Sequence, residues 1–281
     1  MNSLNHPSPI YTPESCHPTF RLNWSLSIFW TIPIPDPSWL NGLRAALQPD
    51  SIRILNHMTP RDRVSQFLLG SGPSLSPADV VRLVKGRLQH IIRAVHLKAF
   101  HGNYFISSVG QVDRETIEHY VSSQLGHHRM ADPRVQEKLQ PFQFADPAVD
   151  LSAIQATSHG QFISNLHLVL VNHQRWMEIA DDALGALRDI IMKTSVKHRL
   201  RLAAAGIFPD HLHLAVGCTA LQSPQEVALS YMNNLAYAQR MRPIFEFGYY
   251  AGTFGEYNLS AIWRRTHEQK NGTGKKRVNV D

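Results

Sequence analysis

Two groups of residues in this chain could carry out chemistry, and each lies in a different half of the sequence. The first is the pair His211 and His213, separated by Leu212 in the segment PDHLHL. Alternate residues of a strand point to the same face, so both imidazoles would project together. Two imidazoles can share one divalent cation and leave coordination positions open for phosphate oxygens. In a chain with 16 histidines, such a pair can also be incidental.

The second group is Tyr120 with Gln124, four residues apart on a helix expected over 113–124. Residues at this spacing share one helical face. A tyrosine hydroxyl can attack a phosphodiester and form a covalent phosphotyrosine, and a nearby metal would polarise the phosphate. Gln124 could add a neutral third ligand through its amide oxygen. The competing interpretation is a half-buried tyrosine with a solvated neighbour.

An internal repeat relates the halves that carry these groups. At an offset of 145, Gly110 matches Gly255 and Gln124 matches Gln269, but Arg265 stands where the first copy has Tyr120. At an offset of 147, a second set of residues matches: Gly70 with Gly217, and Ser76-Pro77 with Ser223-Pro224. There the first half has Val64-Ser65-Gln66 where the second has its histidines. One copy thus keeps a tyrosine and the other keeps a histidine pair.

The elements that must position these residues follow the same order in both halves. Apolar and β-branched runs predict strands at 23–31, 51–55, 64–69, 104–109, 166–171, 200–205, 211–216 and 249–254. Helices are expected at 39–47, from 76, at 113–124, at 181–192 and from 223 to about 241, with Ser-Pro openings at 76 and 223. Each half therefore reads β-α-β-β-α-β-α. The predicted fold class is α+β, with two tandem ferredoxin-like domains forming a single-chain pseudo-dimer.

The expected domain boundaries follow from composition and from the repeat. Residues 1–19 read as a flexible arm, 20–125 as the first domain and 126–160 as a linker. Residues 161–269 read as the second domain, and 270–281 as a basic tail.

Composition places the chain among globular proteins rather than disordered ones. It has 281 residues, of which 43% are hydrophobic and 18% charged, and no apolar run approaches the length needed to span a bilayer. Two cysteines and no secretory signal predict a cytoplasmic protein, nucleoid-associated when it binds DNA. A formal net charge of +6 favours polyanionic partners without proving them.

The histidine segment, the Ser-Pro helix and the segment YFISSVGQVDRETIEHYVSSQ, taken together, resemble one family. The family that they resemble is that of the small single-tyrosine HUH transposases of insertion sequences (TnpA-like, in the REP-associated tyrosine transposase superfamily). Each half follows the family's order of motifs but fills only part of it.

The resemblance implies composite sites, because in this family the tyrosine helix of one subunit docks on the histidine pair of the other. Carried over, Tyr120 would be the nucleophile, and His211, His213 and Gln124 would bind Mg²⁺ or Mn²⁺. The other composite position would pair Arg265 and Gln269 with Val64-Ser65-Gln66, and should be inactive.

The resemblance implies single-stranded DNA that bears a hairpin as the partner. A basic helix face at Arg82, Lys85, Arg87 and Arg93 could track its phosphates, although an ordinary solvated surface explains these residues equally well. Aromatics such as Tyr104 and Tyr249 could stack on bases or belong to the sheet core. No membrane partner is expected, and pseudo-dimers could associate further.

The sequence thus predicts a metal-dependent single-stranded DNA endonuclease and strand transferase acting through a 5′-phosphotyrosine. One alternative is a domesticated, catalytically inactive protein that binds nucleic-acid hairpins. Another is a structural or regulatory partner of a recombinase.

Overall fold

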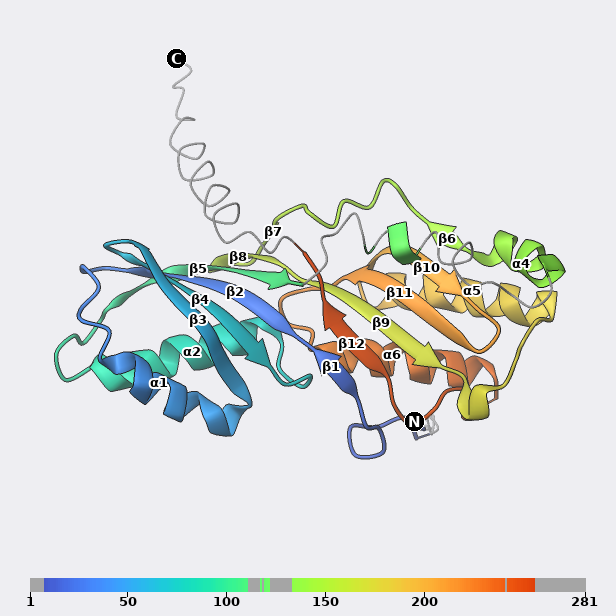
Figure 1. The fold of residues 1–281 in the computed structure, drawn as a ribbon, viewed down its shortest axis with the longest axis horizontal. Coiled ribbons are helices and arrows are strands. Elements are labelled where there is room, and N and C mark those ends of the chain that lie inside the picture. Colours follow the sequence, from blue (N-terminus) through green and yellow to red (C-terminus); the bar gives the residue numbers. More distant parts are fainter. Residues whose placement is uncertain (1–7, 111–116, 118, 122–132, 241, 256–281) are drawn as a thin grey trace, which may run out of the picture.

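The computed structural model describes residues 8–110, 117, 119–121, 133–240 and 242–255. It contains two six-stranded sheets, ordered β3-β4-β2-β5-β8-β7 and β1-β12-β9-β11-β10-β6. The sheets lie side by side along the long axis of the molecule, with helices packed against each (Figure 1). The predicted α+β class is confirmed.

Four consecutive strands of each sheet, with two helices, form a ferredoxin-like unit. The first unit comprises β2 (Asn23–Trp30), α1 (Trp39–Leu47), β3 (Ile52–Arg61), β4 (Val64–Ser71), α2 (Pro77–Ile92) and β5 (Phe100–Val109). The second comprises β9 (Asn165–Val171), α5 (Asp181–Lys197), β10 (Arg201–Ile207), β11 (His211–Gly217), α6 (Pro224–Ala238) and β12 (Tyr250–Thr253). The orders β3-β4-β2-β5 and β10-β11-β9-β12 are equivalent, so the two units share one topology.

The sequence encodes the start of the second helix of each unit in the same way. Ser76 and Ser223 are N-caps whose hydroxyls accept from the backbone N–H of Asp79 and Glu226, and those carboxylates accept in return from the cap N–H groups. Such capping boxes satisfy two backbone donors that a helix start would leave without a partner. Pro77 and Pro224 occupy the first helical turn, where no N–H is needed.

Strand β11 separates two chemically different faces. Leu212, Leu214 and Val216 are buried in the core that includes residues of α6, while Ala215 belongs to a separate cluster. Because side chains alternate along a strand, His211 and His213 share the face of Ala215. The histidine pair therefore lies on the side of the second sheet opposite its helices.

Each sheet is extended by a short strand from the other half. β1 (Thr19–Arg21) leads into β2 but pairs in parallel with β12. β8 (Gly160–Ile163) leads into β9 but pairs in parallel with β5. The exchange is reciprocal, as expected for two units related by an approximate two-fold axis.

Hydrogen bonds at the junction repeat the same symmetry. The Asn23 N–H donates to Thr253 Oγ1 at 2.8 Å, and this hydroxyl donates to Val109 O at 2.7 Å. In the equivalent position, the Asn165 N–H donates to Ser108 Oγ at 3.0 Å, and that hydroxyl donates to Phe254 O at 2.9 Å. Each hydroxyl joins two backbone groups of the opposite half, which fixes the halves relative to each other.

The described part of the expected flexible arm over 1–19 is anchored. Tyr11 is 1% exposed, its hydroxyl donates to Phe245 O at 2.9 Å, and it belongs to the core of the second unit. The sequence prediction missed this because its polar, proline-rich neighbours gave no periodic pattern.

The expected linker over 126–160 also contains ordered elements within its described residues. They are α4 (Pro133–Leu139), β6 (Phe144–Ala145), β7 (Gln155–Ala156) and the start of β8. β6 pairs with β10 and β7 with β8, so this segment contributes an edge strand to each sheet. Short 3-10 turns complete the described fold at Gln48–Asp50, Gln140–Phe142 and His173–Arg175. Of the residues described, no helix is long and apolar enough to cross a membrane, and the expected basic tail lies outside them.

Candidate composite active site

The histidine pair of β11 is only slightly accessible. His213 is 7% exposed and the His211 side chain 13%. Their ring centroids lie 5.0 Å apart. The i, i+2 spacing thus places two neighbouring imidazoles on one face of the sheet, as the sequence predicted.

His211 is held by a carboxylate that belongs to the preceding residue. Its Nδ1 lies 2.6 Å from Asp210 Oδ1, and Asp210 Oδ2 lies 3.0 Å from Arg175 Nη1. Burial raises the pKa of Asp210, but His211 and Arg175 together outweigh it and leave the pKa below its ordinary value. Asp210 is therefore a carboxylate that contacts a different neighbour with each oxygen.

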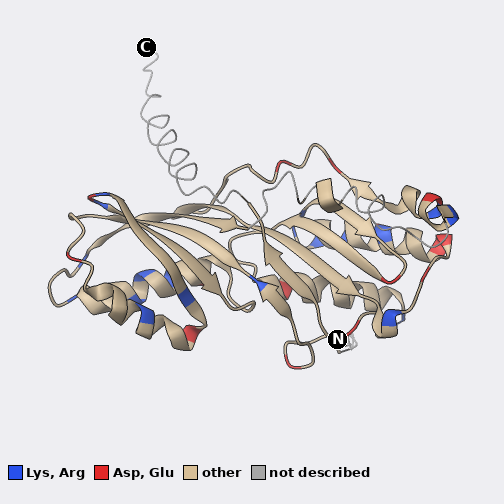
Figure 2. Ribbon diagram, viewed as in Figure 1, with Lys and Arg blue, Asp and Glu red and all other residues tan. Residues whose placement is uncertain are grey.

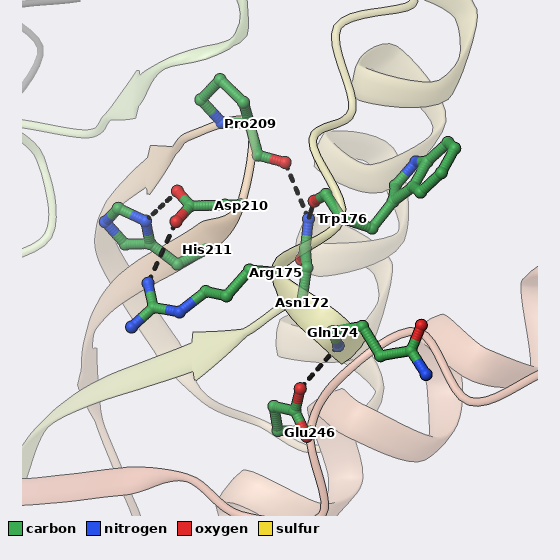
Figure 3. Close-up of polar contacts among 8 residues, drawn as sticks. All are labelled: Asn172, Gln174, Arg175, Trp176, Pro209, Asp210, His211 and Glu246. Carbon is green, nitrogen blue, oxygen red and sulfur yellow. Dashed lines mark hydrogen bonds and ion pairs between the residues drawn. The ribbon is translucent and has the colours of Figure 1, made fainter.

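The loop after β9 supports this contact (Figure 3). Asn172 Nδ2 donates to Pro209 O at 2.8 Å and to Trp176 O at 3.0 Å, and the Glu178 N–H also donates to Pro209 O at 2.8 Å. These bonds fasten the loop to the Pro209-Asp210 turn that precedes β11.

Within that loop, Gln174 and Arg175 both have left-handed backbones, with φ of 55° and 54°. Such conformations are unfavourable for residues other than glycine and persist where surrounding contacts enforce them. Here the Gln174 N–H donates to Glu246 Oε1 at 2.5 Å, and the guanidinium of Arg175 reaches Asp210.

His213 contacts a histidine that the sequence analysis did not single out. Its Nδ1 lies 2.9 Å from Nε2 of His167 on β9. Burial lowers the pKa of His167 to about 4, so this ring is neutral near pH 7. The alternation in Asn165–Val171 could have placed His167 on the histidine face, but only the strand register shows that it reaches His213.

Tyr120 reaches this face from the first half. Ile117, His119, Tyr120 and Val121 have helical backbones, and Ile117 and Val121 are buried against a cluster of the second unit. That cluster includes Ala204 of β10 and Ala215 of β11. Small side chains let the helix approach closely: a Cβ on Gly206 would lie 2.9 Å from Val121 O.

The ring of Tyr120 lies beside His213 and His167, the two histidines that contact each other. Its centroid is 5.9 Å from that of His213 and 6.1 Å from that of His167, edge to face in both cases. Tyr120 itself is 41% exposed. The structure therefore brings together a tyrosine of the first half and the histidine pair of the second.

The expected divalent cation can be tested against the donors present. Of the residues described, no three His, Cys, Asp or Glu side chains are grouped to hold a metal, and Gln124, the expected third ligand, lies outside them. The two imidazoles nevertheless suit a cation, because each has its Nδ1 engaged by a supporting group. A supporting contact of this kind is typical around metal-binding histidines.

The equivalent position of the first half lacks imidazoles. Gln66 stands where His213 does, and its Nε2 donates to Ser25 Oγ at 3.2 Å, as His213 contacts His167. Met58 lies opposite Gln66 in the strand register, where Gly206 lies opposite His213. The expected partners Arg265 and Gln269 lie outside the described residues.

The four basic residues proposed to contact DNA lie on or just after α2, in the helical layer of the first unit (Figure 2). Three already have partners within the chain: Arg82 pairs with Asp79, Arg87 pairs with Asp50, and Lys85 donates to His101 O and Gly102 O. Arg93 is exposed and forms no ion pair with any residue in the described part of the chain. Helix α2 packs on the face of the first sheet that carries Trp24 and Leu26. Gln66 lies on the opposite face, so the sheet separates the basic residues from it.

Comparison with known proteins gives weak likenesses only. No family model and no curated protein matches the chain. A candidate transposase from Deinococcus radiodurans is 21% identical, with 37% of this chain and 89% of that chain covered and a TM-score of 0.30. A REP-associated tyrosine transposase bound to a REP hairpin is 12% identical, with 39% and 68% covered and a TM-score of 0.30. A candidate transcriptional repressor of the glycine cleavage system is 9% identical, with 84% and 99% covered and a TM-score of 0.23. Likenesses this weak carry no argument about function, so function has to be argued from the geometry of the site.

Proposed function

We propose that the chain is a metal-dependent single-stranded DNA endonuclease and strand transferase with one composite active site. Tyr120 supplies the nucleophile from the first half, and His211 and His213 supply metal ligands from the second. The observation that carries this proposal is the position of the Tyr120 ring against His213, across the junction between the halves.

The proposed reaction is an exchange of phosphodiester bonds. The Tyr120 hydroxyl loses its proton to solvent and its oxygen attacks phosphorus, so that a P–O bond to tyrosine forms while the P–O3′ bond breaks. The released 3′ oxygen takes up a proton, and the 5′ phosphate stays on Tyr120. Attack by a 3′-hydroxyl on this phosphotyrosine reverses the step or joins a new strand.

His211 and His213, with Gln124 as the expected third ligand, would hold Mg²⁺ or Mn²⁺. When bound, the cation supplies positive charge that offsets the negative charge developing on the phosphate oxygens. His213 is 7% exposed and its neighbour His167 is partly buried and neutral, and such burial strengthens electrostatic effects at this part of the site.

One chain would make one covalent link at a time. The Gln66–Ser25 hydrogen bond occupies the position equivalent to His213–His167, and an amide bonded to a serine is a poor substitute for an imidazole ligand. A two-ended reaction would therefore need two chains or a second enzyme.

Single-stranded DNA bearing a hairpin remains the proposed partner. Contact through α2 is proposed chiefly for Arg93, because Arg82, Arg87 and Lys85 would have to give up contacts within the chain. Replacing a contact within the chain by one to a phosphate adds less to the affinity for DNA than a phosphate contact made by a side chain such as that of Arg93.

Covalent trapping tests the proposal. The full chain is incubated with labelled single-stranded DNA hairpins and Mn²⁺, and the products are separated on a denaturing gel. A shifted band is expected for the wild type, and none for Tyr120→Phe or His213→Ala. Tyr237→Phe is the matched control, because this exposed tyrosine lies on α6 and should keep the adduct. An adduct that persists in Tyr120→Phe would overturn the assignment of the nucleophile.

The second candidate is a domesticated hairpin-binding protein without chemistry. The loss of imidazoles at Val64-Ser65-Gln66 favours it, because it shows that one of the two composite positions no longer holds a histidine pair. This candidate predicts binding to hairpins with no adduct in the wild type, and the same affinity in Tyr120→Phe.

A further inference from the structure

The two imidazoles of β11 share a structural feature beyond their spacing. Each has its Nδ1 occupied by a group from outside β11: Asp210 Oδ1 at 2.6 Å from His211, and His167 Nε2 at 2.9 Å from His213. Given the nuclease proposed above, we propose that Asp210 and Arg175 are positioning residues for His211, and that His167 is the positioning residue for His213. Their role is to select the tautomer that puts the lone pair of each ring on Nε2.

The argument for His211 rests on donors and acceptors. Arg175 can only donate, so the carboxylate oxygen that it contacts must accept. A carboxylate next to a guanidinium stays ionised, so its second oxygen accepts as well. Nδ1 of His211 must then be the donor, and Nε2 the atom that carries the lone pair.

The loop that carries Arg175 is built to hold it in place. Gln174 and Arg175 keep left-handed backbones that are unfavourable for these residue types. Asn172 fastens the loop to the turn before His211, and Glu246 fastens it to the segment before β12 (Figure 3). The backbone N–H of Glu178 adds a second bond to that turn. An isolated surface salt bridge does not need such a network of hydrogen bonds around it.

The argument for His213 rests on strand register. Val169 lies directly opposite His213, so His167 reaches it diagonally from the neighbouring strand. One proton lies between the two ring nitrogens, and it can belong to either. A cation on Nε2 of His213 requires that its Nδ1 be the donor, and the acceptor is then Nε2 of His167.

The tautomers can be measured without metal or DNA. Long-range ¹H–¹⁵N spectra of the full chain at about pH 8 distinguish Nδ1–H from Nε2–H rings, and His211→Gln and His213→Gln variants assign the signals. His211 is expected as Nδ1–H in the wild type. A wild-type His211 in the Nε2–H form would overturn the proposal.

Asp210→Asn gives the sharpest test. An asparagine has one acceptor and one donor end, and its NH₂ group cannot face Arg175. The amide oxygen would therefore turn to Arg175 and the NH₂ group to His211, which converts His211 to Nε2–H. Mn²⁺ affinity, measured by electron paramagnetic resonance, should fall about tenfold or more. Asp182→Asn is the matched control, because this exposed carboxylate at the start of α5 accepts from the backbone N–H of Ala183.

A double variant separates positioning from mere structural support. Arg175→Asn removes the guanidinium and suits a left-handed backbone. Combined with Asp210→Asn, it frees the amide oxygen to accept from His211 again, so the Nδ1–H form and part of the Mn²⁺ affinity should return. A purely structural role predicts that the double variant is worse than Asp210→Asn alone, and that result would overturn the proposal.

His167→Asn is expected to weaken Mn²⁺ binding by a similar factor and to mix the tautomers of His213. His198→Asn, at the partly buried C-cap of α5, is the control and should change neither. Unchanged tautomers and Mn²⁺ affinity within twofold of wild type in His167→Asn would remove His167 from the proposal. Because the tautomer readout needs no substrate, a failure of positioning is distinguishable from a failure of Tyr120 to form an adduct.

Discussion

The ring of Tyr120, from the first half, lies edge to face with that of His213, from the second, at a centroid distance of 5.9 Å. The contact is possible because the helical residues Ile117 and Val121, although they belong to the first half, pack on alanines of the second sheet. A tyrosine and a histidine pair that are about ninety residues apart in sequence thereby share one site.

The composite site should form within one chain. A mixture of Tyr120→Phe chains with His213→Ala chains should therefore give no more phosphotyrosine adduct than either alone, because each chain lacks one half of its own site. The measurement is adduct yield on a denaturing gel with both variants present. Yield approaching that of the wild type would show instead that chains exchange their tyrosine helices.

Gly206→Ala should displace the tyrosine helix. Its Cβ would lie 2.9 Å from Val121 O and 3.0 Å from Phe208 Cε2, so the helix or the strand must shift. We expect a loss of about 1–3 kcal/mol in the free energy of unfolding and a larger fractional loss of adduct. Denaturant unfolding and covalent trapping measure the two effects.

Gly86→Ala is the matched control for that substitution. Gly86 lies within α2, and a Cβ there meets nothing within 4 Å. Alanine should stabilise the helix by up to about 1 kcal/mol and leave adduct yield unchanged. If Gly206→Ala behaved like Gly86→Ala, close packing of the helix on β10 would not be needed for the site.

Thr253→Val should loosen the junction of the halves. The hydroxyl accepts from Asn23 N–H and donates to Val109 O, and valine can do neither. Leaving these backbone groups without a partner should cost about 1–3 kcal/mol in the free energy of unfolding. Thr59→Val, at an exposed position of β3, is the control and should be nearly neutral. Equal stability of the two variants would contradict a stabilising role for the junction bonds.

His57 should make the fold less stable as the solution becomes acidic. Burial, with a smaller effect of Arg44, lowers the pKa of His57 in the folded chain. As pH falls through about 6.5, the unfolded chain takes up a proton first, so the free energy of unfolding decreases until the folded pKa is passed. Its slope against pH between 7 and 5 should therefore be shallower in His57→Gln than in the wild type. An identical slope would show that His57 is not shielded as its packing against Trp39 suggests.

Much of the fold could be predicted from the sequence, because its signals are local. Ser76-Pro77 and Ser223-Pro224 start helices where a capping box forms within four residues. The alternation in HLHLAV decides which face of β11 carries the imidazoles. The expectation that Tyr120 and the histidines would meet came from the family resemblance, with which the complementary losses of the repeat agreed.

The tertiary structure alone decided what depends on register and on long-range contacts. The alternation of β9 assigns His167 to a face, but it does not identify its partner. The contacts of His167 with His213 and of Arg175 with Asp210 exist only because β9 pairs with β11 in one register and the following loop folds back on the turn. The anchoring of Tyr11 and the exchange of β1 and β8 between sheets likewise depend on groups far apart in the chain. The sequence by itself determined which side chains face together on one element. Which elements then meet is decided by packing of the whole chain, because a strand edge or an apolar face specifies the kind of partner it needs but not the segment that provides it.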